Sequence, residues 1–170
     1  METEFTPAPE DWRKAVADRI PLYGHRNWIA VVDSAYPAQS CDGIETIVAE
    51  ADQAEVVEAV LQALSGSRHV RPIVHTDAEL AFVDEHDAPG VTAYRVQLAA
   101  ALGDHAAISL IHEQIIHKLD EAGQTFRILI IKTNMTIPYT SVFLQLDCKY
   151  WSADAEQRLR ARMPTPEAEP

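Results

Sequence analysis

The sequence is poor in glycine, cysteine and basic side chains, and each shortage excludes a class of protein. Its six glycines are widely separated, so they form no glycine-rich loop of the kind that cradles nucleotide phosphates. Its two cysteines, Cys41 and Cys148, have neither CxxC spacing nor a disulfide framework, which favours a reducing, cytoplasmic location. Because its apolar runs are far shorter than a membrane span, we expect no membrane partner.

The charge balance excludes another class of partner. The chain has 26 acidic and 14 basic residues, with a net charge of -12. Such a chain repels the phosphate backbone that dominates nucleic-acid affinity, so we expect no nucleic-acid partner. With 47% apolar and 24% charged residues over a length of 170, the composition is typical of one globular domain.

Hydrophobic patterning predicts strands that alternate with helices. We assign residues 9–162 to a single α/β domain, residues 1–8 to a frayed N-terminus and residues 163–170 to a disordered tail. Alternating elements of this kind imply a sheet between layers of helices. The expected strands are 28–32, 44–48, 70–74, 91–96, 106–111, 126–132 and 141–146, and the expected helices include 10–20, 56–64, 98–102, 113–122 and 153–162.

A local motif predicts one further helix start. In the run Thr76-Asp77-Ala78-Glu79, the Thr76 hydroxyl and the Glu79 carboxylate have the spacing of a capping box, in which each satisfies a free amide of the first turn. We therefore expect a helix to begin there.

Several polar residues stand at the ends of expected strands, where ligands bind in open α/β sheets. Asp33 ends the first strand, although capping the turn before Pro37 is an alternative role. His25 precedes the same strand, and taken alone it is better explained as an ordinary loop histidine. His112 follows the strand at 106–111, and Tyr139 lies in a polar loop, where it suits either sugar recognition or an interface.

No metal site is predicted. His112 and His117 are five residues apart, which places their imidazoles about 140° apart around a helix rather than on one face. The histidine and acidic residues between positions 75 and 87 are explained by a solvated loop with a capping box.

Two segments resemble the D-ribose pyranase and L-fucose mutarotase family. The first is the run 24–37, in which Gly24-His25 precedes a strand that Asp33 ends and Tyr36-Pro37 follows. The second joins the strand at 130–133 to Pro138-Tyr139-Thr140-Ser141-Val142, as in the family's second signature.

The resemblance implies a three-layer α/β/α sandwich with a mostly parallel, mixed sheet. It implies homo-oligomeric rings with a monosaccharide such as ribose or fucose held at subunit contacts, and a cofactor-free interconversion of anomers or ring forms. If the roles of the family's site residues are transferred to the matching positions, the resemblance implies that His25 is the general acid or base and that Asp33 is its partner. His112, Tyr139 and Ser141 bind the sugar; an ungapped count gives His117 in place of His112, but His112 ends a strand.

Departures from the family pattern keep alternatives open. Ser141 stands where the family has asparagine, and Asn134-Met135 where Gly-Glu is common. A sugar-binding or assembly protein of the same fold is therefore the second interpretation. A lyase or isomerase acting on another polar metabolite is the third.

The spacing of His25 and Asp33 constrains the assembly. They are eight residues apart, which in strand conformation separates them by about 20 Å or more. One sugar cannot contact both within a single chain unless the chain bends back near Asn27, so we predict that the site combines two copies.

Overall fold

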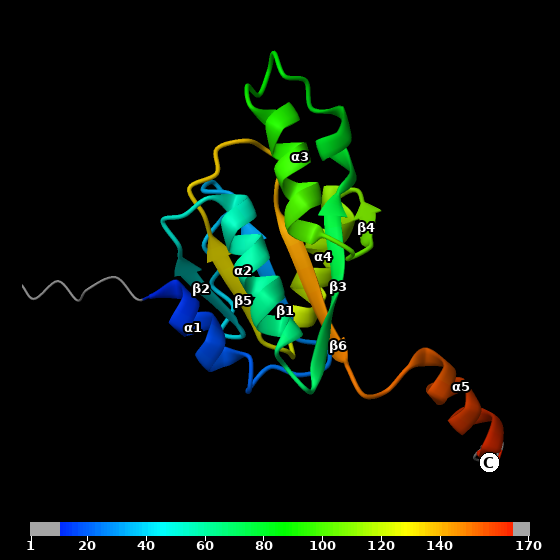
Figure 1. Cartoon of the computed structure of the whole chain (residues 1–170). Coiled ribbons are helices and arrows are strands. Elements are labelled where there is room, and N and C mark those ends of the chain that lie inside the picture. Colours follow the sequence, from blue (N-terminus) through cyan, green and yellow to red (C-terminus); the bar gives the residue numbers. More distant parts are fainter. Residues whose placement is uncertain (1–10, 165–170) are drawn as a thin grey trace, which may run out of the picture.

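The structure, a computed structural model, describes residues 11–164. The predictions made for residues 1–8 and for residues 165–170 of the tail lie outside this range. In the described part, strands and helices alternate along the chain, and α-helices cover both faces of one sheet (Figure 1). The predicted α/β architecture with a mixed sheet is confirmed.

Within residues 11–164, the sheet has six strands in the order β2-β5-β1-β6-β3-β4. The other five strands form parallel pairs on either side of β6: β5 pairs with β2 and β1, and β3 pairs with β4. Strand β6 runs antiparallel to both β1 and β3. The beginning of β6 therefore lies at the same edge of the sheet as the carboxyl ends of its two neighbours. The strands are β1 (Trp28–Val32), β2 (Ile44–Val48), β3 (Val70–Asp77), β4 (Ala107–Leu110), β5 (Ile128–Lys132) and β6 (Val142–Cys148).

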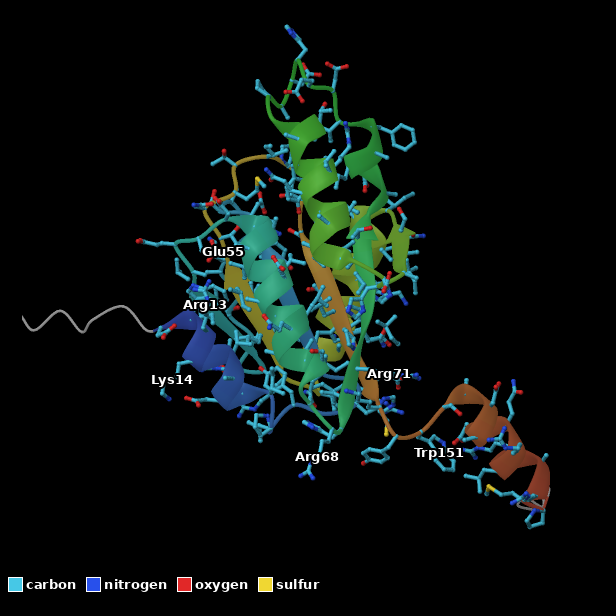
Figure 2. All side chains as sticks on the ribbon, viewed as in Figure 1. Arg13, Lys14, Glu55, Arg68, Arg71 and Trp151 are labelled. Carbon is cyan, nitrogen blue, oxygen red and sulfur yellow. The ribbon has the colours of Figure 1, made fainter. Side chains whose placement is uncertain are left out.

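Three helices cover one face of the sheet and one covers the other. Helices α1, α2 and α3 pack on the first face, and an ion pair between Arg13 of α1 and Glu55 of α2 joins two of them (Figure 2). Helix α4 packs on the second face through Ile115 and Leu119. The helices are α1 (Trp12–Arg19), α2 (Gln53–Ser65), α3 (Val91–Leu102), α4 (His112–Gly123) and α5 (Ala153–Arg162), with a short 3-10 helix η1 (Ala78–Phe82).

The central strand β1 explains why its sequence has no polar interruption. All five of its residues are buried, with Ile29 and Val31 in the core beneath α1 to α3 and Trp28, Ala30 and Val32 in the core beneath α4. A strand covered on both faces needs apolar residues at every position. Its bounds are those predicted from the sequence.

The prediction of a strand at 91–96 is wrong, because this segment forms the first half of α3. The buried residues of α3 are Val91, Tyr94, Leu98 and Leu102, spaced three and four apart as on one helix face. Val96, which lies between the buried residues Tyr94 and Leu98 in sequence, is exposed.

The predicted capping box is also wrong. Thr76 and Asp77 still belong to β3, because pairing of Asp77 with Leu110 of β4 extends the strand beyond its expected end. The helix that follows is the short η1, and no side chain caps it. Glu79 accepts a hydrogen bond from the main-chain N–H of His112 instead, so it caps the start of α4.

Helix α5 extends away from the sheet and the other helices, beyond Trp151 (Figures 1 and 2). It is well capped by Ser152, but none of its residues is buried. Among the helices within residues 11–164, none is long and apolar enough to cross a membrane.

Truncation after Tyr150 is expected to leave the stability of the domain intact, because α5 buries no side chain. The free energy of unfolding, measured by urea titration, should change by less than about 0.5 kcal/mol, the usual range for changes away from the core. A loss of several times that size would show that α5 packs on the domain in solution.

Candidate functional site

The site lies where the ends of several strands meet. Asp33 follows the carboxyl end of β1, and Asp77 ends β3. Because β6 starts between them and runs the opposite way, Ser141, the residue before β6, lies at the same edge. His112 follows β4 and is the first residue of α4. Four elements thus place polar side chains around one hollow.

This hollow is a pocket of about 350 Å³, within the range of small-molecule sites. The turn after β1, the end of β3, the start of α4 and the loop before β6 form its walls. Its lining residues are Asp33, Ala35, Tyr36, Pro37, Gln39, Asp77, His112, Glu113, Ile116, Pro138, Tyr139 and Ser141.

His112 is fixed through both its main chain and its ring. Its main-chain N–H donates to the two carboxylate oxygens of Glu79 at 3.0 and 3.1 Å. Its ring nitrogen Nδ1 lies 3.0 Å from Oδ1 of Asp77. The ring of Tyr139 packs edge-on against the imidazole, with centroids 5.7 Å apart. The imidazole therefore has one defined orientation.

Asp77 supports the imidazole from within the protein. Its side chain is fully buried, and among the described residues its Oδ2 atom has no hydrogen-bond partner. Burial raises the pKa of Asp77, while the hydrogen bond from His112 acts in the opposite direction. A buried carboxylate with one bonding partner is costly, which is typical of a functional group rather than of a stabilising contact.

Asp33 lies both in the turn after β1 and in the wall of the pocket. Its carbonyl accepts a hydrogen bond from the N–H of Tyr36, so it forms part of the turn before Pro37, and it also lines the pocket. Burial raises the pKa of Asp33, although its own main-chain amide and His112 partly oppose the shift.

Substitution Asp33→Asn is expected to change how stability depends on pH. Because burial raises the folded-state pKa above the unfolded value of about 3.9, the folded protein holds this proton more tightly. Its contribution to stability is therefore present below about pH 3.9 and is lost as pH rises through the folded-state pKa. Asparagine does not titrate, so the Asp33→Asn variant does not lose stability at this position as pH rises. Its free energy of unfolding should therefore exceed that of the native chain at neutral pH.

Urea unfolding at a series of pH values measures this effect, with Asp104→Asn on an exposed loop as the control. An Asp33→Asn variant that follows the native pH dependence throughout would contradict the burial argument.

Tyr139 and Ser141 come from the loop that precedes β6. Tyr139 has a left-handed backbone with φ of 59° and is 40% exposed. Bulky residues adopt this conformation rarely, and such strain is concentrated at functional sites. Ser141 is 4% exposed and lines the pocket together with Asp33 and Asp77.

His25 lies at the opposite edge of the sheet, before β1. Its Nδ1 atom is 3.2 Å from Oδ1 of Asp147, which also pairs with Arg71 (labelled in Figure 2). More than half of the His25 side chain is exposed. A single chain therefore brings Asp33, His112, Tyr139 and Ser141 together but leaves His25 apart.

His117 is on the outer side of α4, where it lines a separate hollow with Leu110 and Glu121. His112 rather than His117 faces the pocket. Within residues 11–164, no three side chains of His, Cys, Asp and Glu are grouped to hold a metal ion.

Sequence reasoning missed Asp77 as a site residue. The capping-box pattern assigned a local role to its segment, yet its partner His112 is 35 residues away in sequence. A signal was present, because Asp77 ends a strand just as Asp33 does.

Comparison with known proteins supports the fold. No protein-family model matches the sequence, and no curated protein matches it. Among solved structures, *Bacillus subtilis* RbsD complexed with D-ribose has a TM-score of 0.53 and 16% identity, covering 86% of this chain and 98% of that chain.

Two further structures are similar. The fucose mutarotase of *Streptococcus pneumoniae* in complex with L-fucose has a TM-score of 0.51 and 18% identity, covering 85% of this chain and 98% of that one. FucU from *Bifidobacterium longum* has a TM-score of 0.51 and 16% identity, covering 82% and 93%. The resemblance seen in the sequence is thus confirmed as a shared fold.

Proposed function

We propose that the protein is a mutarotase or pyranase-like isomerase that interconverts the anomers or ring forms of a reducing monosaccharide. The observation that carries the proposal is the pocket in which Asp33, His112, Tyr139 and Ser141 meet. Proteins of the same fold have been solved with D-ribose and L-fucose, which favours a sugar as the occupant.

The reaction needs two proton transfers and no cofactor. A base removes the proton from the anomeric hydroxyl, the bond between the anomeric carbon and the ring oxygen breaks, and an acid protonates that oxygen. The product is the open-chain aldehyde or ketone. Closure on the other face of the carbonyl, or through another hydroxyl, reverses both transfers and gives the second form.

The pocket residues have distinct proposed roles. Asp33 accepts a hydrogen bond from a sugar hydroxyl, and Tyr139 covers one face of the ring. The Ser141 hydroxyl contacts a further hydroxyl of the sugar. The half-exposed Tyr139 ring and the buried Ser141 hydroxyl offer one apolar face and one polar contact, a combination that suits a sugar.

His25 is proposed to transfer a proton in the pocket of a second copy of the chain. The five residues of β1 alone span about 16 Å, so His25 cannot reach the pocket of its own chain. Its side chain is exposed and available to a neighbour. The functional unit is therefore a homo-oligomer with sites between copies.

Exchange NMR on a panel of reducing sugars, including ribose and fucose, tests the proposal. With the protein present, exchange between the anomeric or ring-form signals of at least one sugar should become faster. Shifted signals without faster exchange would instead indicate a sugar-binding protein and overturn the assignment as an isomerase.

A further inference from the structure

We infer that His112 and Asp77 form the second acid/base group of the site, with His112 transferring a proton to or from the sugar and Asp77 acting as its positioning residue. The inference rests on the proposed function and deepens it, because ring opening requires a base and an acid. His25 supplies one of these from a neighbouring copy, and His112 supplies the other from the chain that holds the sugar.

The first argument is the restraint on the imidazole. Glu79 holds the main chain at His112, Asp77 holds Nδ1 at 3.0 Å, and Tyr139 packs against the ring. Its side chain is 28% exposed, whereas that of Asp77 is fully buried. A sugar in the pocket therefore reaches the imidazole but not the carboxylate behind it.

The second argument is the proton arrangement. A carboxylate only accepts hydrogen bonds, so in the neutral imidazole Nδ1 carries the proton and donates it to Oδ1 of Asp77. Nε2 then has a free lone pair, and it has no protein partner among residues 11–164. It can accept the proton of a sugar hydroxyl and later return it to the ring oxygen. The resulting imidazolium is stabilised by Asp77.

The charged surroundings favour this cation. Asp77 and Glu79 face His112 from β3 and η1, Asp33 from the turn after β1, and Glu113 from α4 itself. Lys132 acts on Asp33 but does not line the pocket, and the other titratable side chains in the pocket wall are the phenols of Tyr36 and Tyr139. Four carboxylates thus surround an imidazole that becomes positive during the reaction.

Substitution Asp77→Asn tests the inference, because asparagine keeps the size of the side chain and removes the fixed acceptor. Its amide group can donate to Nδ1, which allows the proton to move to Nε2. We expect the exchange rate at saturating sugar to fall by about 10²-fold or more, with little change in the sugar concentration that gives half the maximal rate. Imidazole ¹⁵N shifts should report a proton on Nδ1 in the native protein and on Nε2 in the variant.

Asp104→Asn, on an exposed loop, is the matched control and should behave as the native chain. The Asp77→Asn variant is expected to fold, because burial penalises the charged form of Asp77 and raises the pKa of this residue. A second variant, Asp77→Glu, restores a carboxylate and should recover part of the rate. A native ¹⁵N pattern with the proton on Nε2, or an unchanged rate in Asp77→Asn, would overturn the inference. Absence of exchange with the native protein would instead overturn the proposed function.

Discussion

Replacement of His112 with alanine is expected to lower the rate of ring opening by about 10²- to 10⁴-fold, the usual contribution of a positioned proton donor or acceptor. The other pocket residues stay in place, but the imidazole nitrogen that we propose as the proton acceptor is lost. Exchange NMR at saturating sugar measures the effect. The matched control is His117→Ala, five residues along the same helix, where the side chain lines a different hollow and the rate should stay native.

Loss of the imidazole leaves Asp77 buried without its hydrogen bond, which costs stability. His112→Gln keeps an amide donor near Asp77 and serves as the second variant if the alanine protein unfolds. The rate should fall in both, and circular dichroism should confirm that the variant assayed is folded. Equal losses in the His112 and His117 variants would show that the helix, rather than the imidazole, matters.

Co-expression of His25→Ala and Asp33→Asn chains should restore activity that neither variant has alone. If each pocket takes His25 from one copy and Asp33 from the next, random assembly of equal amounts leaves both groups native in about a quarter of the pockets. We therefore expect about a quarter of the native exchange rate in the whole co-expressed mixture, purified through one tag that both variants share.

The control pair is Asp33→Asn with His112→Ala. Both residues line the pocket of one chain, so every pocket in the mixture retains a defect and no activity should return. Recovery in the control pair, or none in the first pair, would contradict the two-copy site.

Elements covered on both faces were predictable from the sequence, because their pattern is simple. β1 and β5 are interior strands of the sheet and are almost wholly buried, so each has a continuous apolar run. α3 was not predictable in the same way. Polar and apolar residues alternate by chance in segment 91–96. The segment is helical because Tyr94 and Leu98 are buried in the core with α2 and the sheet.

The site was predictable in part. Asp33 and His112 follow strands, a position that local patterns indicate, and both line the pocket. The role of Asp77 was not predictable, because the pairing of β3 with β4 determines where its strand ends. His25 lies away from the pocket of its own chain, and its proposed place in the pocket of a second copy does not follow from the fold of one chain.

The central claim is that a sugar ring opens in the pocket of Asp33 and His112. The most direct test compares the exchange rate between the two anomeric proton signals of one accepted sugar in the presence of the native protein and of an Asp33→Asn, His112→Ala double variant. The account predicts acceleration by the native protein and the uncatalysed rate with the folded double variant. Equal acceleration by both proteins would contradict it.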